Sequence, residues 1–152
     1  MADDLTMQKL ILDDSWAYKV TVLADLLARR IAPIVQDVSG LNLSQWRVIA
    51  AVADEPGRTA SQVVDMTPMD KGIVSRAVRT LVERDLIERR SSKQDGRLSH
   101  LYLTDDGSKV YQTIVSALSN AKADGASTGS LEQQQRLLDQ LDQFIAVYSA
   151  EK

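Results

Sequence analysis

The stretch that decides the fold is TASQVVDMTPMDKGIVSRAVRTLVERDLIERRSSKQDGRLSHLYLT, residues Thr59 to Thr104. Thr59 and Gln62 have the spacing of a capping box, which predicts a short helix at the start of the stretch. Thr67-Pro68-Met69-Asp70 then offers an N-cap, a proline at the first helical position and an acid at the third. This signal predicts a second helix running to about Arg84. Two short helices in succession indicate a helix-turn-helix.

The second half of the stretch changes period. Leu101 and Leu103 alternate with polar neighbours, and Leu86-Ile87 opens a matching segment on the other side of a polar tip. Asp95-Gly96 within that tip is typical of a tight turn. The pattern predicts a β-hairpin, which would form a wing beside the helix-turn-helix.

Upstream, helical periodicity runs from about Asp14 to Val38, where Pro33 is expected to kink the helix. Ser44 is expected to cap the next helix, and Pro56-Gly57 to end it. Downstream, Thr104 is expected to cap a further helix. A last helix is expected from Leu131, after a break of small residues at 125–130.

The two ends carry more apolar surface than the small middle can cover, so the pattern predicts a dimer built from the chain ends. The expected fold is mainly α with a small β-hairpin wing. Residues 1–38 would form an N-terminal dimerisation helix, 39–104 the winged helix-turn-helix, and 105–152 the C-terminal dimerisation helices.

Charge is distributed unevenly along the chain. The net charge is −3, but residues 71–97 hold eight basic and four acidic side chains. That window carries +4 and the remainder −7. A basic window in an acidic protein indicates one face for a polyanion and a body that discourages misplaced binding.

The residue inventory argues against an enzyme and against a metal or cofactor site. The chain has no cysteine and one histidine, His100, so thiolate zinc sites, cysteine redox sensing and multi-histidine sites are excluded. No phosphate-binding glycine loop or nucleophile elbow occurs. The acidic N-terminus does not resemble a signal peptide, and no run approaches the roughly 20 apolar residues of a membrane span. We expect a cytoplasmic protein without membrane contact.

On the predicted second helix, apolar and polar residues separate onto two sides of a helical wheel. Val74, Ala77, Val78 and Leu81 fall on one side. The opposite side suits a major groove of duplex DNA, where arginine can read guanine edges and other groups can hold phosphates. The alternative is a solvated amphipathic helix. The predicted DNA contacts of this helix are Lys71, Gly72, Ser75, Arg76 and Arg79.

The hairpin tip is the second predicted DNA contact. A narrow basic protrusion can enter a minor groove, where negative potential is concentrated. Asp95, two residues before Arg97, is placed to pair with it and fix its rotamer. The alternative is a turn with solvated cations. The predicted contacts are Arg89, Arg90, Lys93, Asp95 and Arg97.

These residues resemble the MarR family of bacterial winged helix-turn-helix regulators. The resemblance is carried by residues 73–76 and 81–89, and above all by Asp95-Gly96-Arg97 followed by Leu101-Tyr102-Leu103-Thr104-Asp105-Asp106-Gly107. Residues 43–49 look like the family's second helix. Asp85 stands where many members have glycine.

The resemblance implies a homodimer with intertwined first and last helices, and a recognition helix from Pro68 to Arg84. It implies that Arg97 is the wing-tip arginine, oriented by Asp95. It also implies a repressor released from DNA when an anionic aromatic ligand binds between the dimer base and the DNA lobes. One motif per chain in a dimer predicts a pseudo-palindromic operator.

Trp16 and Arg47 could supply a ring and a cation to such a ligand, although Trp16 better fits a dimer core and Arg47 better fits a surface or ion-pair residue. Two other readings stay open. The chain could be a DNA-binding regulator controlled by abundance or a partner protein, without any ligand. It could also be a winged-helix scaffold for protein interaction.

Overall fold

The computed structural model describes residues 11–96, 98–123 and 129–150. The chain divides into two compact units, Met1–Ala117 and Leu118–Lys152. The elements in order are the 3₁₀ turn η1 (Leu12–Asp14), α1 (Trp16–Ser39), α2 (Leu43–Asp54), α3 (Ala60–Met66), α4 (Lys71–Glu83), β1 (Ile87–Ser91), β2 (Ser99–Leu103), α5 (Asp105–Ala123) and α6 (Leu131–Ser149). The structure confirms the mainly α fold with one hairpin. None of the described helices is both long and apolar enough to cross a membrane.

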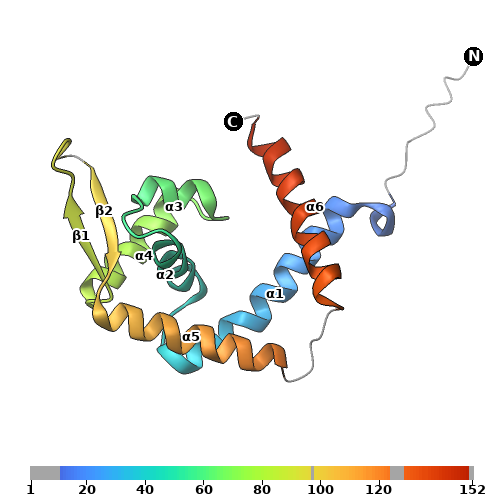
Figure 1. The fold of residues 1–152 in the computed structure, drawn as a ribbon, viewed down its shortest axis with the longest axis horizontal. Helices are drawn as coiled ribbons and strands as arrows, with labels where there is room; N and C mark the ends of the chain where they lie inside the picture. The colour runs from blue at the N-terminus through green and yellow to red at the C-terminus, as the bar shows by residue number, and fades with distance from the viewer. Residues whose placement is uncertain (1–10, 97, 124–128, 151–152) are drawn as a thin grey trace, which may run out of the picture. The chain divides into compact units, whose positions relative to one another are not determined.

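The core of the first unit lies among α2, α3, α4 and the hairpin, which stand together in Figure 1. The predicted apolar side of α4 is confirmed, because all four of its residues named above are buried. Val48, Ile49 and Val52 of α2 face them from the same core, and Leu101 of β2 closes it. Burying this one face of α4 leaves the opposite face to solvent.

The outer helices behave differently from the core helices. In α1, Trp16, Leu23 and Leu26 are 47%, 49% and 58% exposed, and only Val35 is buried. In α6 no described residue is buried, and Leu138 is 54% exposed. The apolar surplus expected at the chain ends is therefore present in the single chain.

Two helix starts differ from the sequence expectation. Helix α2 is capped by Asn42 rather than Ser44, because Asn42 and Gln45 exchange hydrogen bonds of 2.9 Å in a capping box. Helix α4 is capped by Asp70, whose carboxylate accepts from the Ile73 N–H at 2.7 Å. The Thr67 hydroxyl instead donates to the Val63 carbonyl at 2.7 Å, so it ends α3 and does not begin α4.

The wing is an antiparallel hairpin with Ile87 opposite Leu103 and Ser91 opposite Ser99. A third segment joins its edge. The Gly57 N–H donates to the Leu101 carbonyl at 2.8 Å, and the Leu101 N–H donates to the Arg58 carbonyl at 2.9 Å. These bonds tie the wing to the end of α2.

The turn between α4 and β1 depends on Asp85, which has a φ of +55°. Its carbonyl accepts from the Thr104 hydroxyl at 2.7 Å, and that hydroxyl also accepts from the Gly107 N–H at 3.0 Å. The expected cap of α5 by Thr104 is confirmed. The same threonine therefore joins the end of α4 to the start of α5.

Asp85→Gly is expected to stabilise the protein by about 0.5–1 kcal/mol, because glycine adopts a positive φ without a Cβ clash. The Asp85 side chain is exposed, so little packing is lost. Urea unfolding of both proteins gives the measurement. A lower unfolding midpoint in the variant, at an unchanged m-value, would contradict this account of the turn.

Candidate nucleic-acid interface

The exposed face of α4 presents every residue predicted to contact DNA from this helix. Lys71, Gly72, Ser75, Arg76 and Arg79 are all exposed. Asp70 caps the helix directly before them, so the polar face begins at the first helical turn. One helix thus offers hydroxyl, ammonium and guanidinium groups on a single surface.

A hollow of about 280 Å³ lies on one side of α4, between α3, α4 and β1. Lys71 and Ser75 line it from α4, and Arg89 lines it from the wing. The structure therefore brings a cation of α4 and a cation of the wing to the same hollow, a proximity that no sequence pattern predicted.

A second hollow, of about 330 Å³, lies on the other side of α4, against the start of α2. Arg76 and Thr80 line it from α4, and Ser44 and Gln45 from α2. A helix in a major groove has one phosphate backbone on each side. The two hollows therefore place cations where both backbones would pass.

One of the predicted contacts is partly engaged within its own helix. The Arg79 Nε lies 3.9 Å from a Glu83 carboxylate oxygen, and both side chains are exposed. Arg76 forms no ion pair with any of the described residues. Of the two arginines, Arg76 is therefore the one available to a base edge without releasing a carboxylate.

The structure separates the neighbouring wing residues Arg89 and Arg90. Side chains alternate between the two faces of a strand, so Arg89 lines the hollow beside α4, and Arg90 lines a different cavity beside α2 and α5. The sequence had grouped the two together. Of these two residues, Arg89 is the one that lies beside α4.

The tip of the wing carries Lys93 and Asp95, both exposed. The backbone N–H groups of Gln94 and Asp95 donate to the Ser92 hydroxyl at 3.2 Å, which shapes the turn. Arg97, and with it the expected pairing to Asp95, lies outside the described residues. Its assignment as the wing-tip arginine stays a prediction.

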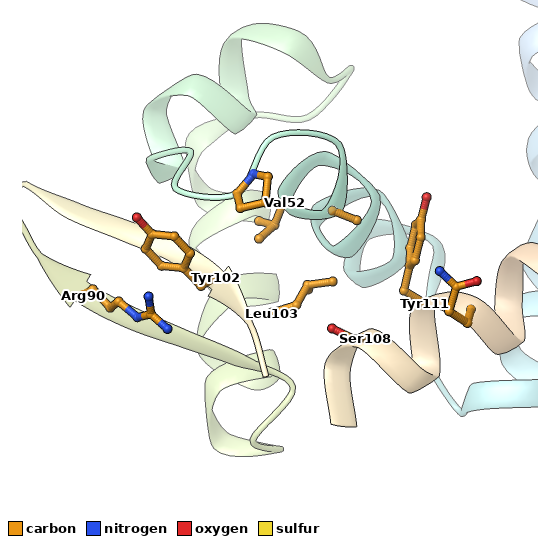
Figure 2. Close-up of a pocket in the computed structure, with 9 residues that line it drawn as sticks. Val52, Arg90, Tyr102, Leu103, Ser108 and Tyr111 are labelled. Carbon is orange, nitrogen blue, oxygen red and sulfur yellow. The ribbon is translucent and has the colours of Figure 1, made fainter. Parts of the chain in front are cut away.

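The cavity beside Arg90, here called the wing-base cavity, has a volume of about 330 Å³. In Figure 2, Arg90 and Tyr102 stand at one end, Tyr111 at the other, and Leu103 and Ser108 between them. The Arg90 guanidinium carbon lies 4.2 Å from the centre of the Tyr102 ring, and its Nε donates to Glu88 at 2.9 Å. No sequence pattern had indicated a ligand-binding role for Tyr102, Ser108 or Tyr111.

Charges near this cavity are paired. Beside Ser108, the ammonium of Lys109 donates to Asp106 at 2.9 Å, and this hydrogen bond raises the pKa of Lys109 above its ordinary value. Lys109 therefore already has a carboxylate partner.

The two residues suggested for a ligand pocket do not meet in the cavities described above. Trp16 lies near the start of α1, and Arg47 is half-buried on α2. The wing-base cavity is lined by other residues. Within the described part of the chain, no cluster of three or more His, Cys, Asp or Glu residues could hold a metal ion.

A capped short helix, an exposed basic helix and a two-stranded wing define a winged helix-turn-helix protein. Residues 39–98 match the model of the MarR family. The resemblance drawn from the sequence is confirmed.

Two known proteins illustrate the likeness. The HTH-type transcriptional regulator MgrA of Staphylococcus aureus is 34% identical over 93 residues, which cover 61% of this chain and 60% of MgrA. The crystal structure of the transcriptional regulator PcaV of Streptomyces coelicolor, in complex with its natural ligand, aligns with a TM-score of 0.71 at 20% identity. The alignment covers 92% of this chain and 98% of PcaV.

The fold also matches a DNA-bound structure. A mutant of MepR from S. aureus, bound to an oligodeoxyribonucleotide, aligns with a TM-score of 0.59 at 17% identity over 88% of this chain and 98% of MepR. The chain spans 43% to 60% of the length of the curated relatives PetP and MgrA. Those two relatives are transcriptional regulators, in agreement with the expectation that this chain is not an enzyme.

Proposed function

We propose that this protein is a transcription regulator that binds a specific sequence of duplex DNA. The observation that carries the proposal is the exposed face of α4, with Arg76 on one side and Lys71 and Arg89 on the other. A basic helix flanked by two cationic hollows suits a major groove with its two phosphate backbones. The names of the matched relatives support the same role.

Neighbouring wing arginines provide the test. Arg89→Ala is expected to weaken duplex binding and to reduce the salt dependence of binding by about one unit of slope, because one phosphate contact is lost. Arg90→Ala removes the same charge on the opposite face of the strand. This variant is expected to leave the affinity for duplex DNA and its salt dependence nearly unchanged. Fluorescence anisotropy at several salt concentrations measures this. Equal losses in the two variants would place the DNA on both wing faces and contradict the interface.

The operator itself can be obtained by selecting bound duplexes from a random pool. The proposal expects an enriched pseudo-palindromic site. A pool that stays random after several rounds, although the protein binds DNA, would contradict sequence-specific recognition.

We further propose that the protein acts as a homodimer. The exposed apolar side chains of α1, and separately those of α6, support this, because large exposed apolar patches mark interaction sites. A dimer would place two recognition helices about one DNA turn apart, roughly 34 Å. This spacing is what predicts the pseudo-palindrome.

A dimer is expected by sedimentation at micromolar concentration. Leu26→Asp, in the exposed apolar part of α1, is expected to shift the population toward monomer because it would bury a carboxylate in the interface. Leu98→Asp, at an exposed leucine of the wing, is the matched control. A wild-type monomer would exclude the proposal.

The regulator is proposed to be a repressor that a small ligand releases from DNA. PcaV, which shares the fold, is described with its natural ligand. The alternative is a ligand-independent regulator controlled by abundance or by a partner protein. A reporter gene placed behind the selected operator distinguishes the ligand-released repressor from the ligand-independent regulator. Repression that no aromatic compound relieves would favour the ligand-independent regulator. Absence of salt-sensitive duplex binding would favour a protein-interaction scaffold instead.

A further inference from the structure

The wing-base cavity is unused by the DNA contacts proposed above. It opens between the end of α2, the hairpin and the first turns of α5, on the strand face that carries Arg90. Its volume of about 330 Å³ falls at the lower end of the range for small-molecule sites, roughly 300–1,000 Å³. A molecule of one or two rings matches that size.

Both aromatic ends of the cavity are held in place before any ligand arrives. The Tyr102 hydroxyl packs against Gly57, where an added Cβ would lie 3.0 Å from the phenol oxygen. At the far end, Tyr111 stacks on Trp46 with ring centres 5.8 Å apart and planes 23° apart. Fixed rings lower the ordering cost of binding a planar molecule.

The charged group that lines the cavity is already paired with a neighbouring carboxylate. Among the described residues that line it, Arg90 is the one charged at neutral pH, and Glu88 accepts two hydrogen bonds from its guanidinium. Tyr102 covers a face of the same guanidinium. An anion entering the cavity would therefore compete with Glu88 for Arg90 and would meet its negative charge.

The remaining polar groups are neutral. Ser108, labelled in Figure 2, offers a hydroxyl, and Gln112 offers an amide; both lie in the first turns of α5. Leu103 and the end of α2 supply apolar surface beside them. Hydroxyl and amide groups can pair with an amide or phenol edge, and neither requires the ligand to carry charge.

We propose that the wing-base cavity binds a neutral planar aromatic molecule of one or two rings with an amide or phenol edge. Glu88 is the residue that sets this specificity against aromatic carboxylates. A ligand seated there touches both the hairpin and α5, so it would bias the orientation of the wing. That consequence for DNA rests on the proposed function, whereas binding itself does not.

The test compares two compounds with the same ring system, the neutral 2-naphthamide and the anionic 2-naphthoate, by calorimetry on the protein without DNA. The wild type is expected to bind the amide at least tenfold more tightly than the carboxylate. Glu88→Gln removes the competing charge from Arg90 and is expected to raise the affinity for 2-naphthoate at least fivefold. Glu83→Gln removes the carboxylate beside Arg79, outside the cavity, and is expected to change neither affinity.

The site is located by a second variant and a second signal. Gln112→Ala, at an exposed position of α5, is expected to weaken amide binding at least fivefold while circular dichroism stays unchanged. In a Trp16→Phe background, Trp46 is the sole tryptophan and its emission is expected to change on binding through Tyr111.

Three outcomes would overturn the proposal: no binding of either compound, a wild type that prefers 2-naphthoate, or a Glu88→Gln variant that does not gain affinity for it. Because no DNA is present, each outcome leaves the Arg89→Ala result standing. Failure of the cavity and failure of the DNA interface are therefore distinguishable.

Discussion

Replacing Gly107 by alanine is expected to lower the free energy of unfolding by about 2–3 kcal/mol, at the upper end of the overpacking range. A Cβ at this position would lie 1.9 Å from the Leu86 carbonyl oxygen and 2.9 Å from its carbonyl carbon. Both are backbone atoms, so no side-chain rotation relieves the clash. The start of α5 must move away from the turn between α4 and β1.

The displacement would also break a hydrogen-bonded junction. The Gly107 N–H donates to the Thr104 hydroxyl, which in turn donates to the Asp85 carbonyl. Moving α5 therefore weakens two features together, the Thr104 cap of α5 and the turn at Asp85, which has a positive φ. This coupling is why the expected loss exceeds that of an ordinary surface substitution.

Gly96→Ala is the matched control, because a Cβ at Gly96 would meet no atom within 4 Å. Urea unfolding of wild type and both variants is expected to show a large shift of midpoint for Gly107→Ala alone. Similar midpoints for all three proteins would contradict the close approach of α5 to Leu86.

Local signals predicted the elements of the fold well. The Thr59–Gln62 capping box, the apolar side of α4 and the Asp95-Gly96 turn each depend on residues close together in the chain, and the structure shows all three. The two wrong helix starts arose where neighbouring residues competed for one cap. The sequence could not decide that the Thr67 hydroxyl bonds backward to Val63, leaving Asp70 to begin α4.

Long-range arrangements were harder to predict. The wing-base cavity joins residues from α2, the hairpin and α5, and no spacing along the chain indicates that Tyr102 and Tyr111 face one cavity. The division of Arg89 and Arg90 was within reach, because strand alternation alone places neighbours on opposite faces. Charge counting over a window hid that difference. The net charge summed over residues 71–97 likewise counts Glu83 and Glu88 only as negative charges, although each pairs with a particular arginine.

Arg76→Ala is expected to reduce discrimination between the selected operator and a mutated operator by about 1–3 kcal/mol, because an arginine that reads a guanine edge supplies that much. Arg76 is suited to this role by its place. It lies on the exposed face of α4, lines the hollow beside α2, and is engaged by no described carboxylate. Removal of an exposed side chain here is expected to leave unfolding unchanged.

The measurement is a pair of binding isotherms, on operator and on mutated operator, at one fixed salt concentration. Arg136→Ala is the matched control, since Arg136 is an exposed arginine of α6 that pairs with Glu132. That variant is expected to keep the wild-type ratio of affinities. A phosphate contact would weaken binding to both duplexes alike. An equal loss on the two duplexes in Arg76→Ala would therefore reassign Arg76 to the backbone and leave base reading to Ser75 or Arg79.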